Sequence, residues 1–528
     1  MRTARARGWC GLCWTALAAW PLVAGAATGD APIVQSGHER FRGVFDPAAA
    51  GIARFTSIPY AAAPVGPLRW RAPRTLAPRA GVQDATHFAP ACYQNDYNLD
   101  WYRQIWRAFG VAQDPMRNPP FSEDCLYLNV WTPRPAATAN LPVLVWIHGG
   151  NNVAGWPYEP NYLGAHLAAR GPLVFVSIAY RLGIFGFFSH PALADAPFGT
   201  NFGLLDQIAA LRWVHGHIRA FGGDPQNVTI AGESAGGADV QYLMASPLAR
   251  GLFRRAISES GGYMLSDTSR RADAERLGTE LAAALPGDPD LAAMRRLPSA
   301  RIFAAALHRF GDHTYLPVVD GRSLTESPAA YFAQHGAPVD LLIGSNADES
   351  YMYVDGSRRG LAHDLAGFPA AARAPLAHRA AAEATPRLRR ARIDTLAEMT
   401  CPTYLLAGAA ADHGHRAWVY RFSRRRPGPG GVALRVYHGS EIPYALDTPD
   451  PWMPATAADR RLTLTMSAYW AAFVRDGDPN GGSRPPWPLY RPAAPRILRL
   501  DTSPAAVAPP DFALCTQIGP SLYPGWTR

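Results

Sequence analysis

Apolar segments of strand length recur through the middle of the chain, and helical patterns separate them. Four such segments fall within residues 141–150, 171–180, 227–232 and 339–346. Their apolar residues lie on both faces, which is typical of buried parallel strands. Residues 204–218 instead repeat apolar positions at helical spacing. The alternation predicts an α/β fold, in which a central, mostly parallel twisted sheet carries helices on both faces.

Two further segments, residues 263–310 and 356–400, are rich in Ala, Arg and Leu and are expected to be helical. They would form cap or side-wall insertions above the sheet. A length of 528 residues is compatible with several domains, but large α/β enzymes often form a single unit of this size. Because no segment has the composition of a linker, we expect one domain over residues 27–528.

The N-terminus has the layout of a secretory signal peptide. Arg2, Arg5 and Arg7 precede a short apolar stretch, and the small residues 24–26 supply a cleavage site. We therefore expect residues 1–26 to be removed and the protein to be secreted or periplasmic; a retained membrane anchor is the alternative. No other segment is apolar and long enough to span a bilayer, so stable membrane insertion is not expected.

Basic residues exceed acidic ones, but their distribution does not indicate a nucleic-acid partner. The chain contains 51 Lys and Arg against 42 Asp and Glu, and all of the basic residues are arginine. These arginines are dispersed, and the densest cluster, residues 424–426, lies in a segment rich in Pro and Gly. A genomic composition bias accounts for this pattern, so no nucleic-acid binding is expected.

Four cysteines remain once the predicted signal peptide is removed. They are Cys92, Cys125, Cys401 and Cys515. In an exported protein they favour two disulfides, for which the sequence alone permits three connectivities, and free buried thiols are the alternative. Their spacing does not resemble a zinc site, and no metal is expected.

Residues 227–232 lead into Gly-Glu-Ser-Ala-Gly, residues 232–236, with Ser234 at its centre. A Gly-x-Ser-x-Gly sequence between a strand and a helix is typical of a nucleophile elbow, a turn so tight that larger side chains at Gly232 and Gly236 would collide. The serine hydroxyl then projects above the sheet, beside the amide groups that begin the next helix. A serine in an ordinary turn is the alternative interpretation.

A serine nucleophile needs a base, and the base needs an acid to orient it. His438 is the best of fifteen histidines, because it follows a strand-like run and precedes a glycine; His215 and His217 lie on a predicted helix. In α/β-hydrolases the acid lies between the serine and the histidine in the chain. Asp348 and Glu349 both meet this condition, and the pattern does not decide between them.

Backbone donors for a developing oxyanion are expected after the segment that ends near residue 147. The sequence there reads His-Gly-Gly-Asn, and the amides of Gly150 and Asn151 could point at a carbonyl oxygen together with the amide of Ala235. A glycine pair after a strand is otherwise a turn. Its combination with the elbow favours an oxyanion hole.

Two long motifs resemble those of the type-B carboxylesterases, a family that includes bacterial para-nitrobenzyl esterases, animal carboxylesterases and cholinesterases. They are FGGDPQNVTIAGESAG at residues 221–236 and EDCLYLNVWTP at residues 123–133. Shorter matches extend the resemblance over roughly residues 32–520. The resemblance implies an α/β-hydrolase fold and a carboxylic-ester hydrolase that uses no metal or organic cofactor.

The same resemblance assigns roles to particular residues. It places Glu349 rather than Asp348 as the triad acid and His438 as the base. It also implies that Ser260 donates a hydrogen bond to the triad glutamate, and that Glu233 supports the site without giving a proton to the substrate. The disulfides that it implies are Cys92–Cys125 and Cys401–Cys515.

Two features depart from the family pattern or cannot be aligned with it. Asn151 stands where many relatives have glycine, although asparagine tolerates a positive φ better than most residues. Trp101 and Trp106 lie between Cys92 and Cys125, where cholinesterases carry a ligand-binding tryptophan. Neither can be matched to it, and we expect both to pack or to line a pocket.

The sequence therefore predicts an exported serine esterase that hydrolyses small-molecule esters through an acyl-enzyme. A lipase and a non-catalytic binding protein on the same fold are the alternatives. The net positive charge further suggests the hypothesis that arginines at the mouth of the site select carboxylate-bearing esters.

Overall fold

The structure is a computed structural model that describes residues 31–265, 268–311, 315–355 and 360–526. The predicted signal peptide, residues 1–26, lies outside the described residues. The fold described below is that of the compact unit Pro32–Arg528.

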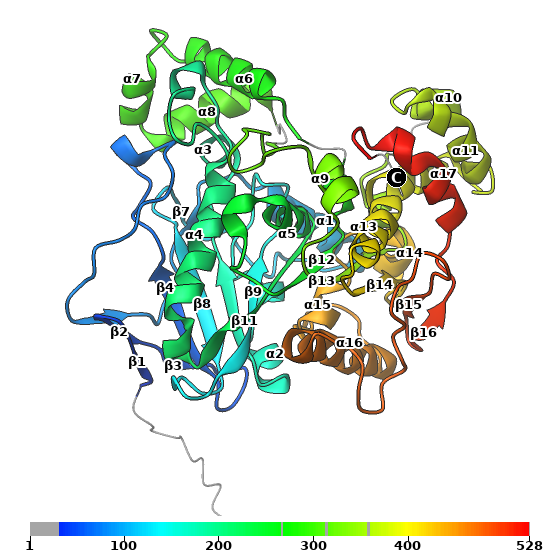
Figure 1. Cartoon of the computed structure of the whole chain (residues 1–528), viewed down its shortest axis with the longest axis horizontal. Helices are drawn as coiled ribbons and strands as arrows, with labels where there is room; N and C mark the ends of the chain where they lie inside the picture. Colours follow the sequence, from blue (N-terminus) through cyan, green and yellow to red (C-terminus); the bar gives the residue numbers. More distant parts are fainter. Residues whose placement is uncertain (1–30, 266–267, 312–314, 356–359, 527–528) are drawn as a thin grey trace, which may run out of the picture. The chain divides into compact units, whose positions relative to one another are not determined.

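A central sheet of eleven described strands organises this unit (Figure 1). Its strands are parallel from β10 to β15, and the flanking strands at both edges run antiparallel. In spatial order they are β16 (Ala505–Val507), β15 (Ile497–Leu500), β14 (Ala417–Phe422), β13 (Asp340–Asn346), β12 (Arg255–Glu259), β11 (Gly223–Glu233), β9 (Leu141–Ile147), β10 (Val174–Ile178), β8 (Tyr127–Thr132), β4 (Ala53–Pro59) and β3 (Val44–Phe45). The predicted α/β-hydrolase architecture is confirmed.

Strand β9 shows why the sheet is covered on both faces. Val143, Val145 and Ile147 belong to one buried cluster, whereas Leu144 and Trp146 belong to another. Because side chains of a strand alternate between faces, these two clusters lie on opposite sides of the sheet. The continuous apolar run in the sequence therefore reflects two packed faces.

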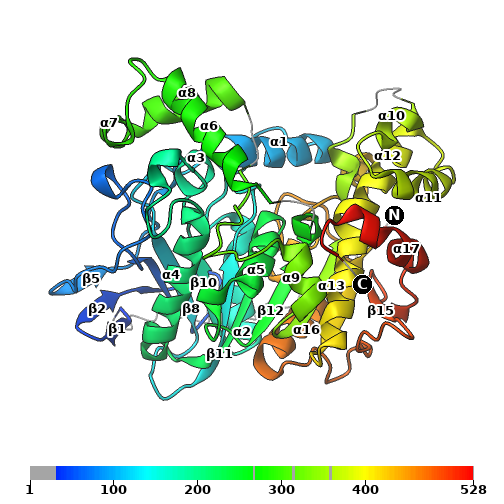
Figure 2. The same cartoon turned by 45° about the horizontal axis from the view of Figure 1, so that its top comes forward.

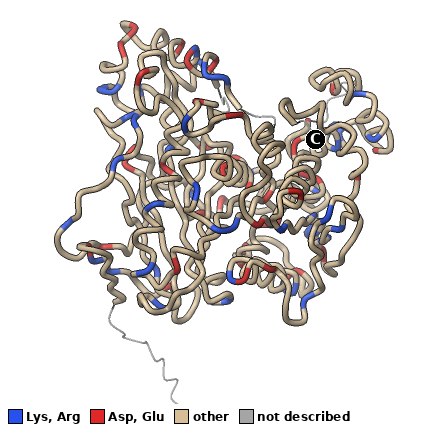
Figure 3. The backbone as a smooth tube through the Cα atoms, viewed as in Figure 1, with Lys and Arg blue, Asp and Glu red and all other residues tan. Residues whose placement is uncertain are grey.

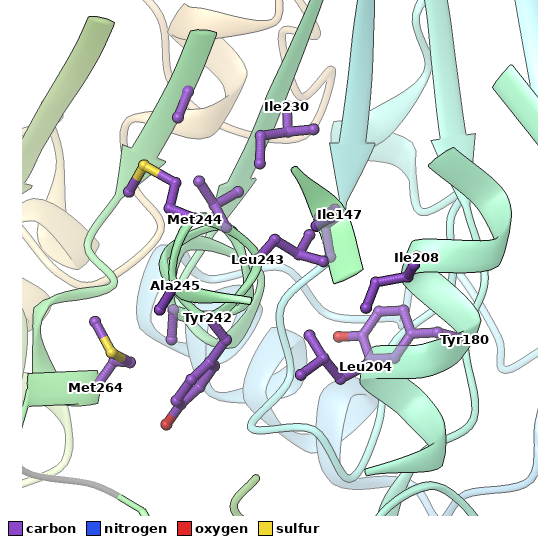
Figure 4. Close-up of a cluster of buried hydrophobic side chains, with 14 of the residues drawn as sticks. Ile147, Tyr180, Leu204, Ile208, Ile230, Tyr242, Leu243, Met244, Ala245 and Met264 are labelled. Carbon is purple, nitrogen blue, oxygen red and sulfur yellow. The ribbon is translucent and has the colours of Figure 1, made fainter. Parts of the chain in front are cut away.

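Helices from distant parts of the chain complete the two clusters. The first cluster contains residues of α4 (Phe202–His217), α5 (Ala235–Ala245) and α13 (Cys401–Asp412); Figure 4 shows Leu243 of α5 beside Ile147. The second contains residues of α2 (Ala165–Arg170) and α16 (Ala457–Asp476). Helices α4 and α5 thus hold one side of the sheet, and α2 and α16 hold the other.

The remaining helices surround this core. Figure 2 shows the group α6–α8 and the group α10–α12 on either side of α1, as expected for the two helical insertions. Their bounds are α1 (Tyr97–Phe109), α3 (Gly183–Gly186), α6 (Arg271–Ala284), α7 (Leu291–Arg296), α8 (Ser299–Phe310), α9 (Pro328–His335), α10 (Leu361–Leu365), α11 (Ala370–Ala380), α12 (Pro386–Thr395), α14 (Pro429–Leu434), α15 (Ile442–Ala445) and α17 (Phe512–Leu522).

Small sheets and two disulfides fix the periphery. The small sheets contain β1 (Ile33–Ser36), β2 (Glu39–Arg42) and β5 (Val82–Asp84), and β6 (Ala91–Cys92) with β7 (Phe121–Ser122). The disulfides join Cys92 to Cys125 and Cys401 to Cys515, which are the pairs that the family resemblance implies. The second bridge connects α13 to α17.

Acidic and basic residues are interspersed along the backbone (Figure 3). None of the described helices combines the length and apolar character that a membrane crossing needs.

One local prediction is wrong. The run before His438 was expected to be a strand, but residues Pro429–Leu434 form α14, and β14 ends earlier, at Phe422. Pro429 begins this helix, where its missing amide costs no intrahelical hydrogen bond, and Arg435 ends it with a φ of 61°. Leu434 and Tyr437 of this run join a buried cluster with Ile105 and Phe109 of α1, whereas Val432 is 73% exposed.

Candidate active site

The tight turn between β11 and α5 places Ser234 at the end of the sheet. Ser234 has φ 57° and ψ −126°, a backbone conformation that residues other than glycine rarely adopt. A Cβ atom at Gly232 would lie 2.5 Å from backbone atoms of Gly236, and one at Gly236 would lie 2.1 Å from the carbonyl oxygen of Ile147. The glycines therefore permit the turn, and the half-buried serine is presented at its apex.

His438 lies between the serine and a carboxylate. Its Nε2 is 2.7 Å from Ser234 Oγ, and its Nδ1 is 2.6 Å from Glu349 Oε2. The histidine is 7% exposed and the glutamate 1%. The structure thus joins residues that lie 204 and 89 positions apart in the chain into one line of hydrogen bonds.

Glu349 is held in place by two further donors. It begins a short turn three residues after the end of β13, and its Oε1 accepts hydrogen bonds from the hydroxyl of Ser260 at 2.6 Å and from the backbone amide of Asn346 at 2.5 Å. Its neighbour Asp348 instead forms an ion pair with Arg435 at 3.0 Å. Of the two acidic candidates, the structure brings Glu349 to the histidine.

Two other histidines considered from the sequence lie elsewhere. His215 and His217 are in the last turn of α4, and the ring of His217 contacts the hydroxyl of Ser36 at 2.9 Å. Neither ring lines the cavity beside Ser234.

Electrostatics around His438 favour its charged form. Burial disfavours the imidazolium, but the neighbouring carboxylates Glu233 and Glu349 outweigh this effect and raise the pKa of His438 to about 10. Glu233 Oε1 lies 3.4 Å from His438 Nε2. Burial in turn raises the pKa of Glu233 well above its ordinary value, against the attraction of the histidine. His438 and Glu233 therefore both have a raised pKa, and each holds a proton more tightly than it would in water.

The loop after β9 lies beside the nucleophile. Gly149 is so close that a Cβ atom there would be 3.1 Å from the Cβ of Ser234. Gly150 and Asn151 follow with φ values of 102° and 57°, and both line the cavity above Ser234. Ala235 is the first residue of α5. The positive φ at Asn151 is the conformation that asparagine tolerates better than most residues.

A cavity of about 330 Å³ opens above these residues. Its described lining is rich in aromatic side chains: Tyr97, Trp101, Tyr102, Tyr162, Tyr263 and Tyr353. Three glutamates, Glu159, Glu233 and Glu398, also line it, whereas none of its described lining residues is arginine. The arginine hypothesis therefore receives no support from this lining.

Trp101 connects the loop between Cys92 and Cys125 to the site. It lies on α1, its ring approaches Gly439, and its Nε1 donates a hydrogen bond of 3.1 Å to the hydroxyl of Tyr353. The ring of Tyr353 lies 6.0 Å from that of His438. Tyr353 thus borders His438 and Trp101 borders the adjacent Gly439; of Trp101 and Trp106, Trp101 lines the cavity.

Sequence reasoning did not identify two buried carboxylates beneath the triad. Asn346 Nδ2 donates a hydrogen bond of 2.5 Å to Glu441, which also lies 3.3 Å from Ser260 Oγ; burial raises the pKa of Glu441 to about 7. Glu259 accepts a hydrogen bond from Trp470 at 2.8 Å. Glu259 directly precedes Ser260 and Glu441 is three residues after His438, and a charged residue between buried neighbours was the available signal.

The described residues contain no group of three or more His, Cys, Asp or Glu side chains arranged to hold a metal ion. The chemistry that the site can support is that of a hydroxyl, an imidazole and a carboxylate. A strained serine after a parallel strand, a histidine on a following loop and an acid between them in the chain define an α/β-hydrolase.

Comparison with known proteins gives the family. A sequence profile described as the carboxylesterase family matches residues 30–364 and 372–512. The fumonisin B1 esterase of Sphingopyxis macrogoltabida is 33% identical over 518 residues, which cover 93% of this chain and 90% of that protein. The chain belongs to the carboxylesterase family and is a carboxylic-ester hydrolase, as the resemblance of its motifs implied.

Two para-nitrobenzyl esterases extend the comparison. The para-nitrobenzyl esterase of Bacillus subtilis (strain 168) is 33% identical over 469 residues, covering 86% of this chain and 92% of that protein. A solved structure titled "PNB esterase another structure" superposes with a TM-score of 0.80 at 31% identity, covering 93% of this chain and 99% of that one.

Proposed function

We propose that this carboxylesterase is an exported serine esterase that works through an acyl-enzyme, with Ser234 as nucleophile, His438 as base and Glu349 as the acid that orients the base. The observation that carries the proposal is the unbroken line of contacts, 2.7 Å and 2.6 Å long, from the serine through the imidazole to the glutamate. Serine is a weak nucleophile unless a base within hydrogen-bonding distance accepts its proton.

The reaction has two halves. In the first, Ser234 attacks the ester carbonyl while His438 Nε2 accepts the hydroxyl proton, and the imidazolium then protonates the leaving alcohol. In the second, His438 takes a proton from water, which attacks the acyl-enzyme, and the acid is released as Ser234 regains its proton. Glu349 stabilises the imidazolium through Nδ1 in both halves.

The oxyanion of each tetrahedral intermediate is bound by the amides of Gly150, Asn151 and Ala235. The proximity of Gly149 to Ser234, the place of Gly150 and Asn151 in the lining of the same cavity, and the start of α5 at Ala235 support this assignment. Loss of one such donor typically costs about 3 kcal/mol of transition-state stabilisation.

Two neighbouring residues position this machinery. Ser260 fixes the carboxylate of Glu349 through their hydrogen bond of 2.6 Å. Glu233 acts electrostatically on His438, 3.4 Å away, and does not donate a proton to the substrate.

Export is proposed from residues 1–26, which have the features of a signal peptide, and the mature catalytic domain then covers residues 27–528. The two disulfides favour an oxidising compartment, either the periplasm or the medium. The test is N-terminal sequencing of the protein recovered from cell fractions. Recovery of an uncleaved protein in the cytoplasm would contradict export.

The proposed substrates are small-molecule esters, in keeping with the cavity of about 330 Å³ and with the esterase names of the relatives. The test is a panel of short-chain and emulsified long-chain esters, with Ser234→Ala as the blank and a fluorophosphonate label to count active serines. We expect labelling and hydrolysis of soluble esters, and loss of both in the variant. An unlabelled, inactive protein would contradict the proposal and favour a binding role, whereas turnover of emulsified esters alone would favour a lipase.

A further inference from the structure

A single π-helical turn places a carboxylate in the wall of the catalytic cavity. The turn covers Leu396–Thr400, between α12 and α13, and four of its five residues are buried. The fifth, Glu398, is exposed and lines the cavity beside Ser234. Because π-turns are rare and occur frequently at functional sites, this presentation suggests a role in recognising the ligand.

The backbone around Glu398 is held firmly. The carbonyl of Ala397 accepts a hydrogen bond of 2.5 Å from the hydroxyl of Tyr523, and Cys401 directly follows the turn and is disulfide-bonded. Gly262 packs so closely that a Cβ atom there would be 2.7 Å from the carbonyl oxygen of Glu398. The backbone that carries this carboxylate is therefore fixed by packing before a ligand arrives.

The other carboxylates of the cavity are less able to contact a ligand. Glu159 is fully buried, and its oxygens accept hydrogen bonds from Asn98 at 2.7 Å and from Tyr102 at 2.8 Å. Glu233 is 4% exposed and lies against His438. Glu398 is thus the exposed carboxylate among the described lining residues.

We propose that Glu398 is a specificity-determining residue that favours esters carrying a positively charged group, such as an ammonium, over neutral esters of the same shape, and disfavours esters that carry a carboxylate. The inference rests on the proposed ester hydrolysis and names a substrate class for it. The aromatic lining supports the same class, because the faces of tyrosine and tryptophan rings attract cations.

The size of the cavity brings a substrate within range of this charge. A volume of about 330 Å³ corresponds to a sphere roughly 9 Å across, so a bound ester contacts several walls at once. Opposite charges 4 Å apart attract by an amount that, even in bulk water, changes an equilibrium about fivefold. Removal of the charge should therefore reduce the preference for the cation by a factor of about five or more.

The experiment compares kcat/KM for matched esters that carry an ammonium, a neutral tert-alkyl group or a carboxylate at the same position. One series carries the group on the alcohol and a second carries it on the acyl part. The proteins are the unmodified chain, Glu398→Gln, Glu398→Asp and a surface control, Glu280→Gln, which removes the same charge from α6. Melting curves verify that each variant is folded.

The expected result is a cation-to-neutral ratio of kcat/KM that falls about fivefold or more in Glu398→Gln in at least one series. The ratio should recover at least partly in Glu398→Asp and stay unchanged in Glu280→Gln. An equal ratio in the unmodified chain and Glu398→Gln, in both series, would overturn the inference while leaving ester hydrolysis intact. Absence of turnover of every ester by the unmodified protein would instead overturn the proposed function.

Discussion

The charge of Glu233 should control the pH at which the site becomes active. Carboxylates, Glu233 among them, raise the pKa of His438 to about 10 in spite of burial. Below this pKa the ring carries a proton and cannot accept the one from Ser234. Catalytic efficiency, kcat/KM, should therefore rise with pH as His438 loses its proton and fall as the pH drops through its pKa.

Glu233→Gln keeps the shape of the side chain and removes its charge. Unit charges separated by the 3.4 Å between Glu233 and His438 attract by about 1.2 kcal/mol in water and about 5 kcal/mol at an effective dielectric constant of 20. One pKa unit corresponds to about 1.4 kcal/mol. The substitution should therefore lower the pKa of His438 by about one to three and a half units and extend activity towards neutral pH.

The assay is kcat/KM for a neutral ester, measured from mildly acidic to strongly alkaline pH in buffers of constant ionic strength. Glu280→Gln, at the surface of α6, serves as the control and should keep the pH profile of the unmodified protein. The decisive quantity is the midpoint of the acidic limb, which is independent of a change in the maximum rate. Coincident midpoints for Glu233→Gln and the unmodified protein would refute the reasoning, because they would mean that Glu233 holds its own proton throughout and exerts no charge on the ring.

Two further predictions concern the support of the site and of the fold. Ser260→Ala should lower kcat/KM about tenfold or more, because a buried hydrogen bond to a charged group contributes about 1.5–3 kcal/mol. The control in steady-state kinetics is Ser258→Ala, since Ser258 is a buried serine that donates to a backbone carbonyl. Equal losses of kcat/KM in the two variants would mean that Glu349 needs no hydrogen bond from Ser260. Replacing Cys401 and Cys515 by serine should lower the free energy of unfolding by up to about 5 kcal/mol, since the bridge closes a separation of 114 residues. Chemical denaturation without reductant measures this loss, and an unchanged midpoint would contradict it.

The nucleophile and the central strands could be located from the sequence because their signals are local. The glycines around Ser234 are required by a turn of a few residues, and the apolar run of β9 reports two covered faces. The reason for choosing His438 was partly wrong, since the segment before it is helical, and its buried residues Leu434 and Tyr437 belong to a cluster with residues of α1. A short apolar run does not distinguish these outcomes, because burial alone produces it.

The rest of the site depends on contacts that no local pattern encodes. Asp348 pairs with Arg435, whereas Glu349 contacts His438, and neither contact is visible in the local sequence. The carboxylate of Glu398 reaches the cavity because a π-turn interrupts two ordinary helices. Such placements are set by tertiary packing, so the sequence identified them only where a family motif covered the residues.

The loop that carries the imidazole is clipped to the loop that carries its acid. The amide of Asp348 donates to the carbonyl of Val436 at 3.1 Å, the amide of Val436 donates to the carboxylate of Asp348 at 3.3 Å, and Asn346 donates to the carbonyl of Tyr437 at 2.9 Å. His438 and Glu349 should therefore move together, whereas Ser234 lies on the separate turn between β11 and α5. Local unfolding of this enzyme should separate Ser234 from His438 while the contact between His438 and Glu349 persists. Ester hydrolysis would then be lost before the imidazole–carboxylate pair is disrupted.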